Sequence, residues 1–281
     1  MISPDRFPRQ AQGGYVGGTT VPGTVVTASG TIHTKGSWTS LVTSAAFDVY
    51  YLQVIVGASN TSGTATAQLL DIGYDASGGT TYSVVVPNIL AGHAVRNIGG
   101  DFNRTMAFPV FIPEGSQIAA RIQALIASDT LEVGLQLVGG RGRTHRLRGE
   151  LKDYGTNLAT SNGTAMTNSA SANAKGAWTQ LGADTIRRHS GLVVALSGAD
   201  SSIGANRHYV DIGIDPTGGT TWTVVIPDIP VGSNTNEAIN YNDVGCFLQA
   251  IEIPAGAAIA ARSQCQAANV NNDLHVAAYG F

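Results

Sequence analysis

Two aspartates in a repeated block are the residues of this chain best suited to hold a metal ion. Asp71 and Asp75 stand four positions apart, and Asp211 and Asp215 repeat them. Carboxylate oxygens are the ligands that Ca²⁺ takes in proteins, but the block lacks the later glutamate that completes a calcium loop. Each second aspartate instead precedes a Gly-Gly pair. We therefore predict a turn whose backbone N–H groups bind the Asp75 carboxylate, with the glycines at positive φ.

The histidines form no recognisable catalytic or zinc-binding pattern. None occupies a repeated position, and the chain contains no His-Glu-x-x-His run, no cysteine pair at zinc spacing and no Gly-x-Ser-x-Gly turn. We therefore predict no catalytic residue, no metal ligand and no cofactor, and the sequence does not identify binding residues. The six histidines are His33, His93, His145, His189, His208 and His275.

Both cysteines fall in the second half of the chain. If each lies in a strand, Cys265 shares its phase with Ile259 and Ala261 and faces the core, whereas Cys246 is out of phase with its apolar neighbours. Opposite faces of one sheet do not allow a disulfide, although a strand that crosses between sheets would. We predict one buried thiol and one surface thiol.

Repeated aromatic residues offer a different kind of site. Trp38 and Trp178 each follow a Lys-Gly pair, and Tyr82 corresponds to Trp222. Aromatic side chains of this kind stack on sugar rings in carbohydrate-binding modules. A repeated tryptophan beside a turn is more commonly buried against the scaffold, because its large apolar area favours packing. We predict packing and keep glycan binding as the alternative.

These residues belong to a segment that occurs twice. Residues 71–89 recur without a gap as residues 211–229, 140 positions later, and residues 112–115 recur at an offset of 141. Solenoid units have periods of roughly 20–50 residues, so this spacing indicates two copies of a whole domain. The predicted boundaries are a flexible N-terminal arm at 1–23, a first copy at 24–139, a basic linker at 140–156 and a second copy at 157–281.

The two segments outside the copies differ in character. The arm is rich in glycine and proline, has no hydrophobic period and has no counterpart in the second copy, so we expect it to dock on a neighbouring subunit or to hang free. The linker contains Arg141, Arg143, Arg146 and Arg148. Such a cluster can bind nucleic acid, but it is short and lacks aromatic residues. We predict a solvated linker and no nucleic-acid partner.

Apolar residues alternate with period two along both copies, separated by Gly-Gly and Pro-x-Gly turns. No long segment keeps a helical period. Strands without helices between them pair antiparallel, so the pattern predicts an all-β chain with two tandem jelly-roll-like β-sandwiches. The clearest alternating sets are Met106, Phe108, Val110 and Ile112; Ile118, Ala120, Ile122, Ala124 and Ile126; and Leu131, Val133, Leu135 and Leu137.

Composition restricts the function classes. Hydrophobic residues make up 43% of the 281 positions, enough for two cores, and charged residues only 12%, about half the usual share. The net charge of −3 gives no reason to expect binding to nucleic acid or to acidic membranes. No segment has the roughly 20 apolar residues of a membrane helix, and the N-terminus shows no signal peptide. We expect a protein made in a cytoplasm and not inserted in a membrane.

The block from Asp71 to Pro87, together with residues 111–115 and 118–121, resembles modules of virion structural proteins of tailed bacteriophages. Those are β-sandwich modules of heads, necks and tails, rich in Gly, Ser, Thr and Ala. The resemblance covers both copies but neither the arm nor the linker, and no functional residue carries over from it. It implies localisation in the virion and release by host lysis, without a signal peptide.

The expected function is therefore a non-enzymatic structural or attachment component of a phage particle, of decoration, collar or fibre type. We expect a homo-oligomer with ring or threefold symmetry that contacts other virion proteins through the arm and gains strength from many weak contacts. The alternative is a tandem carbohydrate-binding module for host glycans. A third interpretation is a depolymerising glycosidase, because paired carboxylates meet in space rather than in sequence.

Overall fold

The computed structural model describes most of both copies, and the described residues contain only β-strands, turns and irregular segments. None of these residues forms a helix that could cross a membrane. The described ranges are 9–13, 23–59, 67–91, 104–139, 151–198, 207–232, 247–249, 251–268 and 274–281.

Both copies are built from short strands in the same succession. The first copy has β1 (Arg9–Gly13), β2 (Thr24–Thr27), β3 (Thr39–Val42), β4 (Val49–Ser59), β5 (Gln68–Asp75), β6 (Ser83–Leu90), β7 (Arg104–Phe108), β8 (Gln117–Ala124) and β9 (Thr130–Gly139). The second has β10 (Lys152–Tyr154), β11 (Thr156–Asn157), β12 (Asn162–Met166), β13 (Thr179–Gly182), β14 (Leu192–Gly198), β15 (Arg207–Asp215), β16 (Thr223–Gly232), β17 (Phe247–Gln249), β18 (Ala258–Cys265) and β19 (Leu274–Gly280).

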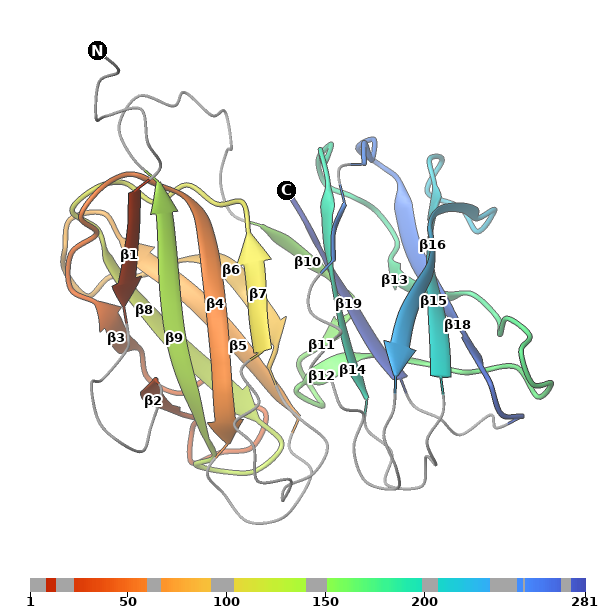
Figure 1. The fold of residues 1–281 in the computed structure, drawn as a ribbon, viewed down its shortest axis with the longest axis horizontal. Coiled ribbons are helices and arrows are strands. Elements are labelled where there is room, and N and C mark those ends of the chain that lie inside the picture. The colour runs from red at the N-terminus through yellow and green to blue at the C-terminus, as the bar shows by residue number, and fades with distance from the viewer. Residues whose placement is uncertain are drawn as a thin grey trace.

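Each copy is a jelly-roll-like sandwich of two packed sheets, with eight principal strands and the additional edge strands β1, β10 and β11 (Figure 1). In the first copy the strand orders are β2-β9-β4-β7 and β3-β8-β5-β6, and in the second copy β12-β19-β14-β17 and β13-β18-β15-β16. Every described pairing is antiparallel. Apart from the consecutive pairs β5–β6, β11–β12 and β15–β16, neighbouring strands come from distant parts of the sequence, as Greek keys require. The structure confirms the predicted all-β fold with two tandem sandwiches.

The alternating apolar residues line the inside of the first sandwich. Leu131, Val133, Leu135 and Leu137 on β9 are at most 1% exposed, and the predicted sets at β7 and β8 are buried in the same way, except for the partly exposed Ile126. Side chains at successive strand positions point to opposite faces, so this alternation places one face of each sheet in the core. The hydrophobic effect of burying these side chains is what holds the two sheets together.

The N-terminal segment differs from the predicted flexible arm. Arg9–Gly13 forms β1 and pairs with β9, so that Gln12 lies opposite Gln136. It also has a counterpart in the second copy, because β10 pairs with β19 in the same way and places Asp153 opposite Tyr279. The arm was hard to recognise as a strand because backbone pairing along a sheet edge does not require an apolar period.

The predicted linker is also shorter than expected. Strands β10 and β11 lie inside the range 140–156 that we assigned to it, and Leu151 is buried in the core of the first copy. The second copy therefore begins near residue 151 rather than at 157. The arginines of the linker, Arg141 to Arg148, lie outside the described residues.

Residues of the second copy complete the hydrophobic core of the first. Val193, Ala195, Ala277 and Tyr279 belong to the second copy, yet they are at most 2% exposed and pack into the core of the first. Their neighbours along β14 and β19 face inward and form the core of the second copy. The sheet that contains β14 and β19 is thus buried on both faces, and it covers the first sandwich along β6.

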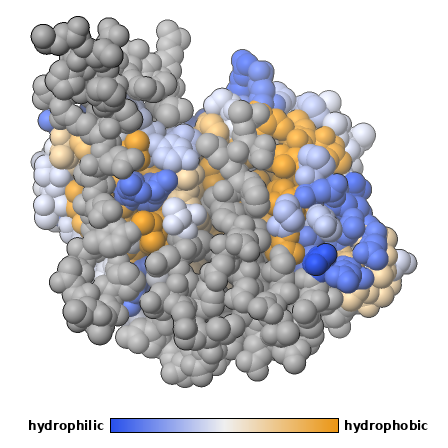
Figure 2. Space-filling view, in the orientation of Figure 1, coloured by the Kyte–Doolittle hydropathy of each residue, from blue (hydrophilic) through white to orange (hydrophobic). Residues whose placement is uncertain are grey.

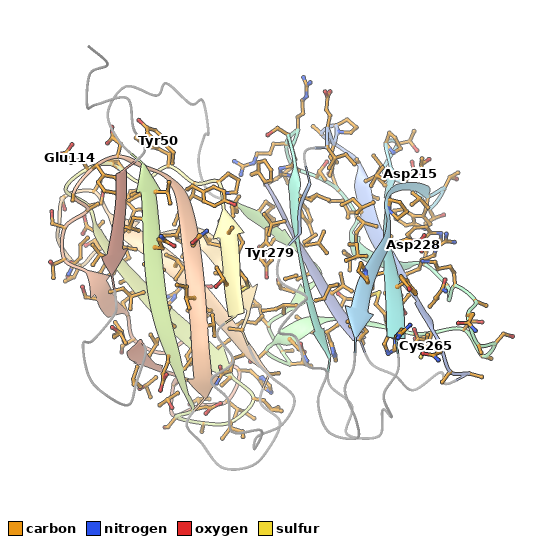
Figure 3. All side chains as sticks on the ribbon, viewed as in Figure 1. Tyr50, Glu114, Asp215, Asp228, Cys265 and Tyr279 are labelled. Atoms are coloured by element: carbon orange, nitrogen blue, oxygen red, sulfur yellow. The ribbon has the colours of Figure 1, made fainter. Side chains whose placement is uncertain are left out.

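Hydrogen bonds fix this junction. The Tyr279 hydroxyl accepts a bond from the backbone N–H of Leu90 at 3.0 Å and donates to the carbonyl oxygen of Asn88 at 2.8 Å. The Asn88 side-chain amide donates to Asp153 at 2.9 Å, and the backbone N–H of Leu151 donates to Val85 at 3.0 Å. In Figure 3 Tyr279 lies where the copies meet. The copies are therefore joined by specific polar contacts as well as by apolar packing.

Candidate functional site

The side chains that repeat most faithfully gather on the outer face of one sheet in each copy. We call this set the repeated face. In the first copy it consists of Lys35, Trp38, Asp71, Tyr82 and Arg121, on and beside the sheet β3-β8-β5-β6. In the second copy it consists of Lys175, Trp178, Asp211, Trp222 and Arg262, on and beside the sheet β13-β18-β15-β16.

A β-bulge explains the first aspartate of the repeated block. The register between β5 and β6 shifts at Asp71, so that this one residue lies opposite both Pro87 and Asn88. Proline has no N–H to donate to the ladder, and Asn88 adopts a left-handed conformation with φ of 49°. The N–H of Asn88 donates to the Asp71 carboxylate at 2.9 Å instead. The carboxylate thus compensates for the ladder bond that the bulge breaks.

The second copy repeats this bulge. Asp211 lies opposite Pro227 and Asp228, where φ of Asp228 is 50°. The N–H of Asp228 donates to Asp211 at 2.9 Å. The Asp-to-Pro spacing of the repeated segment is therefore the sequence signature of a bulge as well as of a turn.

The same carboxylates are held by two cations each. Lys35 Nζ lies 2.7 Å from Asp71 Oδ1, and Arg121 Nε lies 3.0 Å from Asp71 Oδ2. Asp71 has only 4% of its side chain exposed. With a lysine, an arginine and a backbone N–H already bound, the carboxylate is compensated in charge and does not require a metal ion.

The second copy reproduces these ion pairs closely. Lys175 lies 2.7 Å and Arg262 2.9 Å from the Asp211 carboxylate. Burial alone would raise the pKa of Asp211, but the bonds from Asp228, Lys175 and Arg262 outweigh it and lower the pKa below its usual range. Burial lowers the pKa of Lys35, although its pairing with Asp71 opposes this effect.

The repeated tryptophans pack on the sheet beneath the arginines. The guanidinium of Arg121 lies 4.5 Å from the centre of the Trp38 ring, and Arg262 lies 4.5 Å from that of Trp178. A Cβ atom on Gly73 would come within 2.6 Å of the Trp38 ring, so only glycine allows the ring to lie there. The predicted packing role is confirmed for both tryptophans, since Gly213 plays the same part under Trp178.

Each tryptophan has an aromatic neighbour that starts the next strand. Trp38 and Tyr82 have ring centroids 5.2 Å apart, and Trp178 and Trp222 are 6.1 Å apart. All four rings remain partly exposed. The repeated face therefore presents a small aromatic surface beside an arginine in each copy, which is a chemistry suited to stacking on a flat ligand.

The second aspartate of each block holds the predicted turn. Asp75 accepts bonds from the Ser77 backbone at 2.8 Å, the Ser77 hydroxyl at 2.6 Å and the Thr81 backbone at 2.7 Å. These bonds lower the pKa of Asp75, and Gly78 has φ of 72°. Asp215 makes the same three bonds to Thr217 and Thr221. The predicted turn is confirmed in both copies, except that only the first glycine of each pair, Gly78 or Gly218, has a positive φ.

The described histidines lie in separate environments. His208 is 1% exposed, its Nε2 lies 3.9 Å from Sγ of Cys265, and burial lowers its pKa to about 4. His189 is fully buried beside Tyr154, with Nε2 2.7 Å from the hydroxyl. Burial lowers the pKa of His189 to about 4, as does the nearby Arg187, and burial raises that of Tyr154 to about 12.

The remaining predicted residues are distributed as follows. His33 lies at the junction, with Nδ1 2.9 Å from the Ser161 hydroxyl. Cys265 is a buried thiol, as predicted, and Cys246, His93 and His145 lie outside the described residues. Among the described side chains, no group of three or more His, Cys, Asp or Glu is arranged to hold a metal ion.

One position of the bulge differs between the copies in both residue type and surroundings. Asn88 is half-buried and binds Asp153 across the junction. Asp228 instead keeps 64% of its side chain exposed and binds only Lys175 of its own copy, at 2.7 Å, among the described residues. Figure 3 places Asp228 on the side of the second copy away from the first. The β-bulge therefore lies at the junction in the first copy and at the surface in the second.

Comparison with known proteins assigns the chain to no family. No protein-family model matches the chain, and no curated protein matches it. One similar solved structure is that of PNGF-II in space group C2, with 8% sequence identity and a TM-score of 0.36. The alignment covers 86% of this chain and 59% of that chain, so this chain spans less than two thirds of its length. The fold of this protein is therefore defined by its own strand order.

Proposed function

We propose that this chain is a non-enzymatic structural or attachment component of a bacteriophage particle, which acts through multivalent contacts between proteins. The observation that carries the proposal is that the repeated polar residues stabilise the scaffold. Asp71, Asp75 and their counterparts Asp211 and Asp215 are all engaged in bulges, turns and ion pairs of the scaffold. Duplication has thus preserved a rigid module rather than a set of reactive groups.

The joined core supports the same proposal. A chain whose two jelly rolls share the buried residues Val193, Ala195, Ala277 and Tyr279 behaves as one rigid block with two sets of outer surfaces. Many weak sites held in fixed positions on a particle combine into firm attachment without new contacts at any single site. The assignment to a virion, and the role of the N-terminal segment in contacting other virion proteins, come from the resemblance to phage modules.

Purified phage particles provide the test. Mass spectrometry of particles made by a phage that encodes this chain is expected to detect it at a fixed copy number, and cryo-electron microscopy is expected to place it on the head, neck or tail. Absence of the chain from mature particles contradicts the proposal. If the chain is present at a fixed copy number but exposes no surface to the outside of the particle, the structural role is retained and the attachment role is rejected.

A second candidate function is the recognition of host-surface glycans by the repeated face. The partly exposed pairs Trp38–Tyr82 and Trp178–Trp222 favour it, because aromatic rings beside an arginine can stack on sugars and bind their hydroxyls. Glycan-array binding by the intact chain, lost on Trp222→Ala or Tyr82→Ala and retained on Tyr209→Ala, would favour this candidate. An array without any bound glycan rejects it.

A further inference from the structure

The contact between the two copies joins unlike surfaces. The first copy contributes the edge along β6, and the second contributes the outer face of β14 and β19. Each copy has both kinds of surface, so the contact within the chain leaves two surfaces unused. These are the edge along β16 in the second copy and the outer face of β4 and β9 in the first. A heterologous contact of this type can repeat from molecule to molecule, and it closes into a ring when the rotation allows.

The edge along β16 is exposed where the edge along β6 is covered. Pro230 and Asp228 are exposed, whereas their counterparts Leu90 and Asn88 are buried and half-buried at the junction. Val224 is 39% exposed on the same strand. Figure 2 shows apolar surface in orange among polar residues in the region of β15 and β16. This edge therefore retains surface that the first copy buries.

The outer face of the first copy carries polar residues at the positions that the second copy buries. Gln53 pairs with Gln136 across β4 and β9, as Val193 pairs with Tyr279 across β14 and β19. Gln53, Gln136 and the neighbouring Ile55 are partly exposed. A contact made by this face is consequently more polar than the junction within the chain.

The residues on the two unused surfaces match in hydrogen-bonding character. Tyr279 accepts a bond from the N–H of Leu90 and donates one to the carbonyl of Asn88. At the unused edge Pro230 has no N–H that needs an acceptor. A glutamine amide at the position of Tyr279 can still donate to the carbonyl of residue 228.

The residue types at the bulge pair are exchanged between the two surfaces. Asn88 donates to Asp153, which lies opposite Tyr279 on β10. The corresponding positions are held by Asp228 on β16 and by Gln12 on β1, whose backbone lies opposite Gln136. An amide and a carboxylate residue thus occupy this pair of positions in both cases, with their places exchanged.

We propose that a second copy of this chain docks the outer face of β4 and β9, with β1, against the exposed edge along β16, so that the molecules associate head to tail. The proposal deepens the assembly role proposed above and rests on it. It assigns the N-terminal strand β1 to the contact with a neighbouring subunit, in the place that β10 takes within the chain.

The test uses the intact chain and three variants. Gln53→Glu places a carboxylate where the junction buries Val193, and an unpaired charge is strongly disfavoured at such a position. Pro230→Arg places a long cation where the junction buries Leu90. Gln180→Glu, on the exposed side of β13, is the matched control. Circular dichroism and thermal unfolding establish that all variants fold.

Native mass spectrometry and analytical ultracentrifugation at high protein concentration then measure assembly. The unmodified chain and Gln180→Glu are expected to form assemblies larger than a dimer or closed rings, and Gln53→Glu and Pro230→Arg are each expected to be monomeric. An equal mixture of these two variants is expected to form heterodimers and nothing larger, because each supplies one intact surface.

A monomeric unmodified chain overturns the proposal. So do assemblies that survive both substitutions, or a dimer that Gln53→Glu abolishes and Pro230→Arg leaves intact, which would indicate a contact between two like faces. Self-association is measured on the purified chain and the virion role on purified particles, so either can fail while the other holds.

Discussion

The hydroxyl group of Tyr279 lies 3.0 Å from the backbone nitrogen of Leu90, although 189 residues separate them in the sequence. Leu90 ends the edge strand β6 of the first copy, which the second copy covers, and Tyr279 stands on the penultimate position of β19. The ring of Tyr279 also meets Phe108 edge to face, with centroids 5.7 Å apart. The Tyr279 side chain therefore completes the core of the first copy and forms hydrogen bonds with the backbone at its edge.

Removal of this hydroxyl group tests the junction. Tyr279→Phe leaves the N–H of Leu90 buried without its acceptor, which costs about 1–3 kcal/mol. We expect the free energy of unfolding in urea to fall by that amount, with faster amide exchange at Leu90. Tyr209→Phe removes an exposed hydroxyl on β15 and is expected to change stability by less than about 0.5 kcal/mol. Equal effects of the two substitutions would contradict a specific role for the Tyr279 hydroxyl.

The buried carboxylates at the bulges are expected to make the largest contribution of any polar group to the free energy of unfolding of each copy. Asp71→Asn or Asp211→Asn removes the negative charge between a lysine and an arginine and leaves both cations partly buried. Breaking a buried pair in this way costs about 3 kcal/mol when the cations retain some exposure. Chemical denaturation measures this loss, with the exposed Asp184→Asn as control. A loss below about 1 kcal/mol at both sites would mean that the bulges do not depend on charge.

Two buried histidines predict a loss of stability in mild acid. Burial lowers the pKa of His189 and of His208 to about 4, whereas an unfolded chain has a pKa of about 6.5. Between these values the unfolded state binds more protons, so stability is full above pH 6.5 and falls as the pH drops toward 4. Each unit of depression corresponds to about 1.4 kcal/mol, and the two histidines together account for a few kcal/mol.

The first copy supplies a suitable substitution for this test, because Gln68 occupies the position of His208. His208→Gln is expected to reduce the slope of unfolding free energy against pH between 6.5 and 4 while leaving stability at pH 7.5 within about 1 kcal/mol. Urea denaturation at a series of pH values measures the slope. An unchanged slope would show that His208 is not the group that titrates.

Because residues of the second copy complete the core of the first, we expect the two copies to differ in their ability to fold alone. Among the described residues, the core of the second copy is formed by that copy alone, whereas the core of the first includes Val193, Ala195, Ala277 and Tyr279. We expect a fragment of residues 151–281 to fold cooperatively by thermal circular dichroism and a fragment of residues 1–139 to aggregate or remain unfolded. Mixing the fragments is expected to restore the fold of the first. Independent folding of residues 1–139 would contradict a dependence on the second copy.

The sequence predicts the sandwiches well where only one face of a strand is buried. Along β9, Leu131, Val133, Leu135 and Leu137 alternate because the other face of the strand is not in the core. Strand β14 contains Leu192, Val193, Val194, Ala195 and Leu196 in succession, since one face packs inward and the other against the first copy. A continuous apolar run does not show which partner covers each face, so the junction could not be predicted.

The repeated block was only half understood from the sequence for a similar reason. The role of Asp75 was predictable because its partners Ser77 and Thr81 follow within six residues. The partners of Asp71 are Lys35 and Arg121, which are 36 and 50 residues away and meet it only when β3, β8 and β5 assemble. Contacts that depend on strand order are not visible in a linear pattern.

The duplicated bulge has a consequence for how such chains can grow. Its backbone geometry is anchored from within each module by a carboxylate, so the residue on its crest can change without loss of the module itself. In this chain the crest carries an amide at the junction within the chain and a carboxylate at the outer edge of the second copy. Single codon changes at the crest can thus retune what each module contacts, with the interior of every module left untouched.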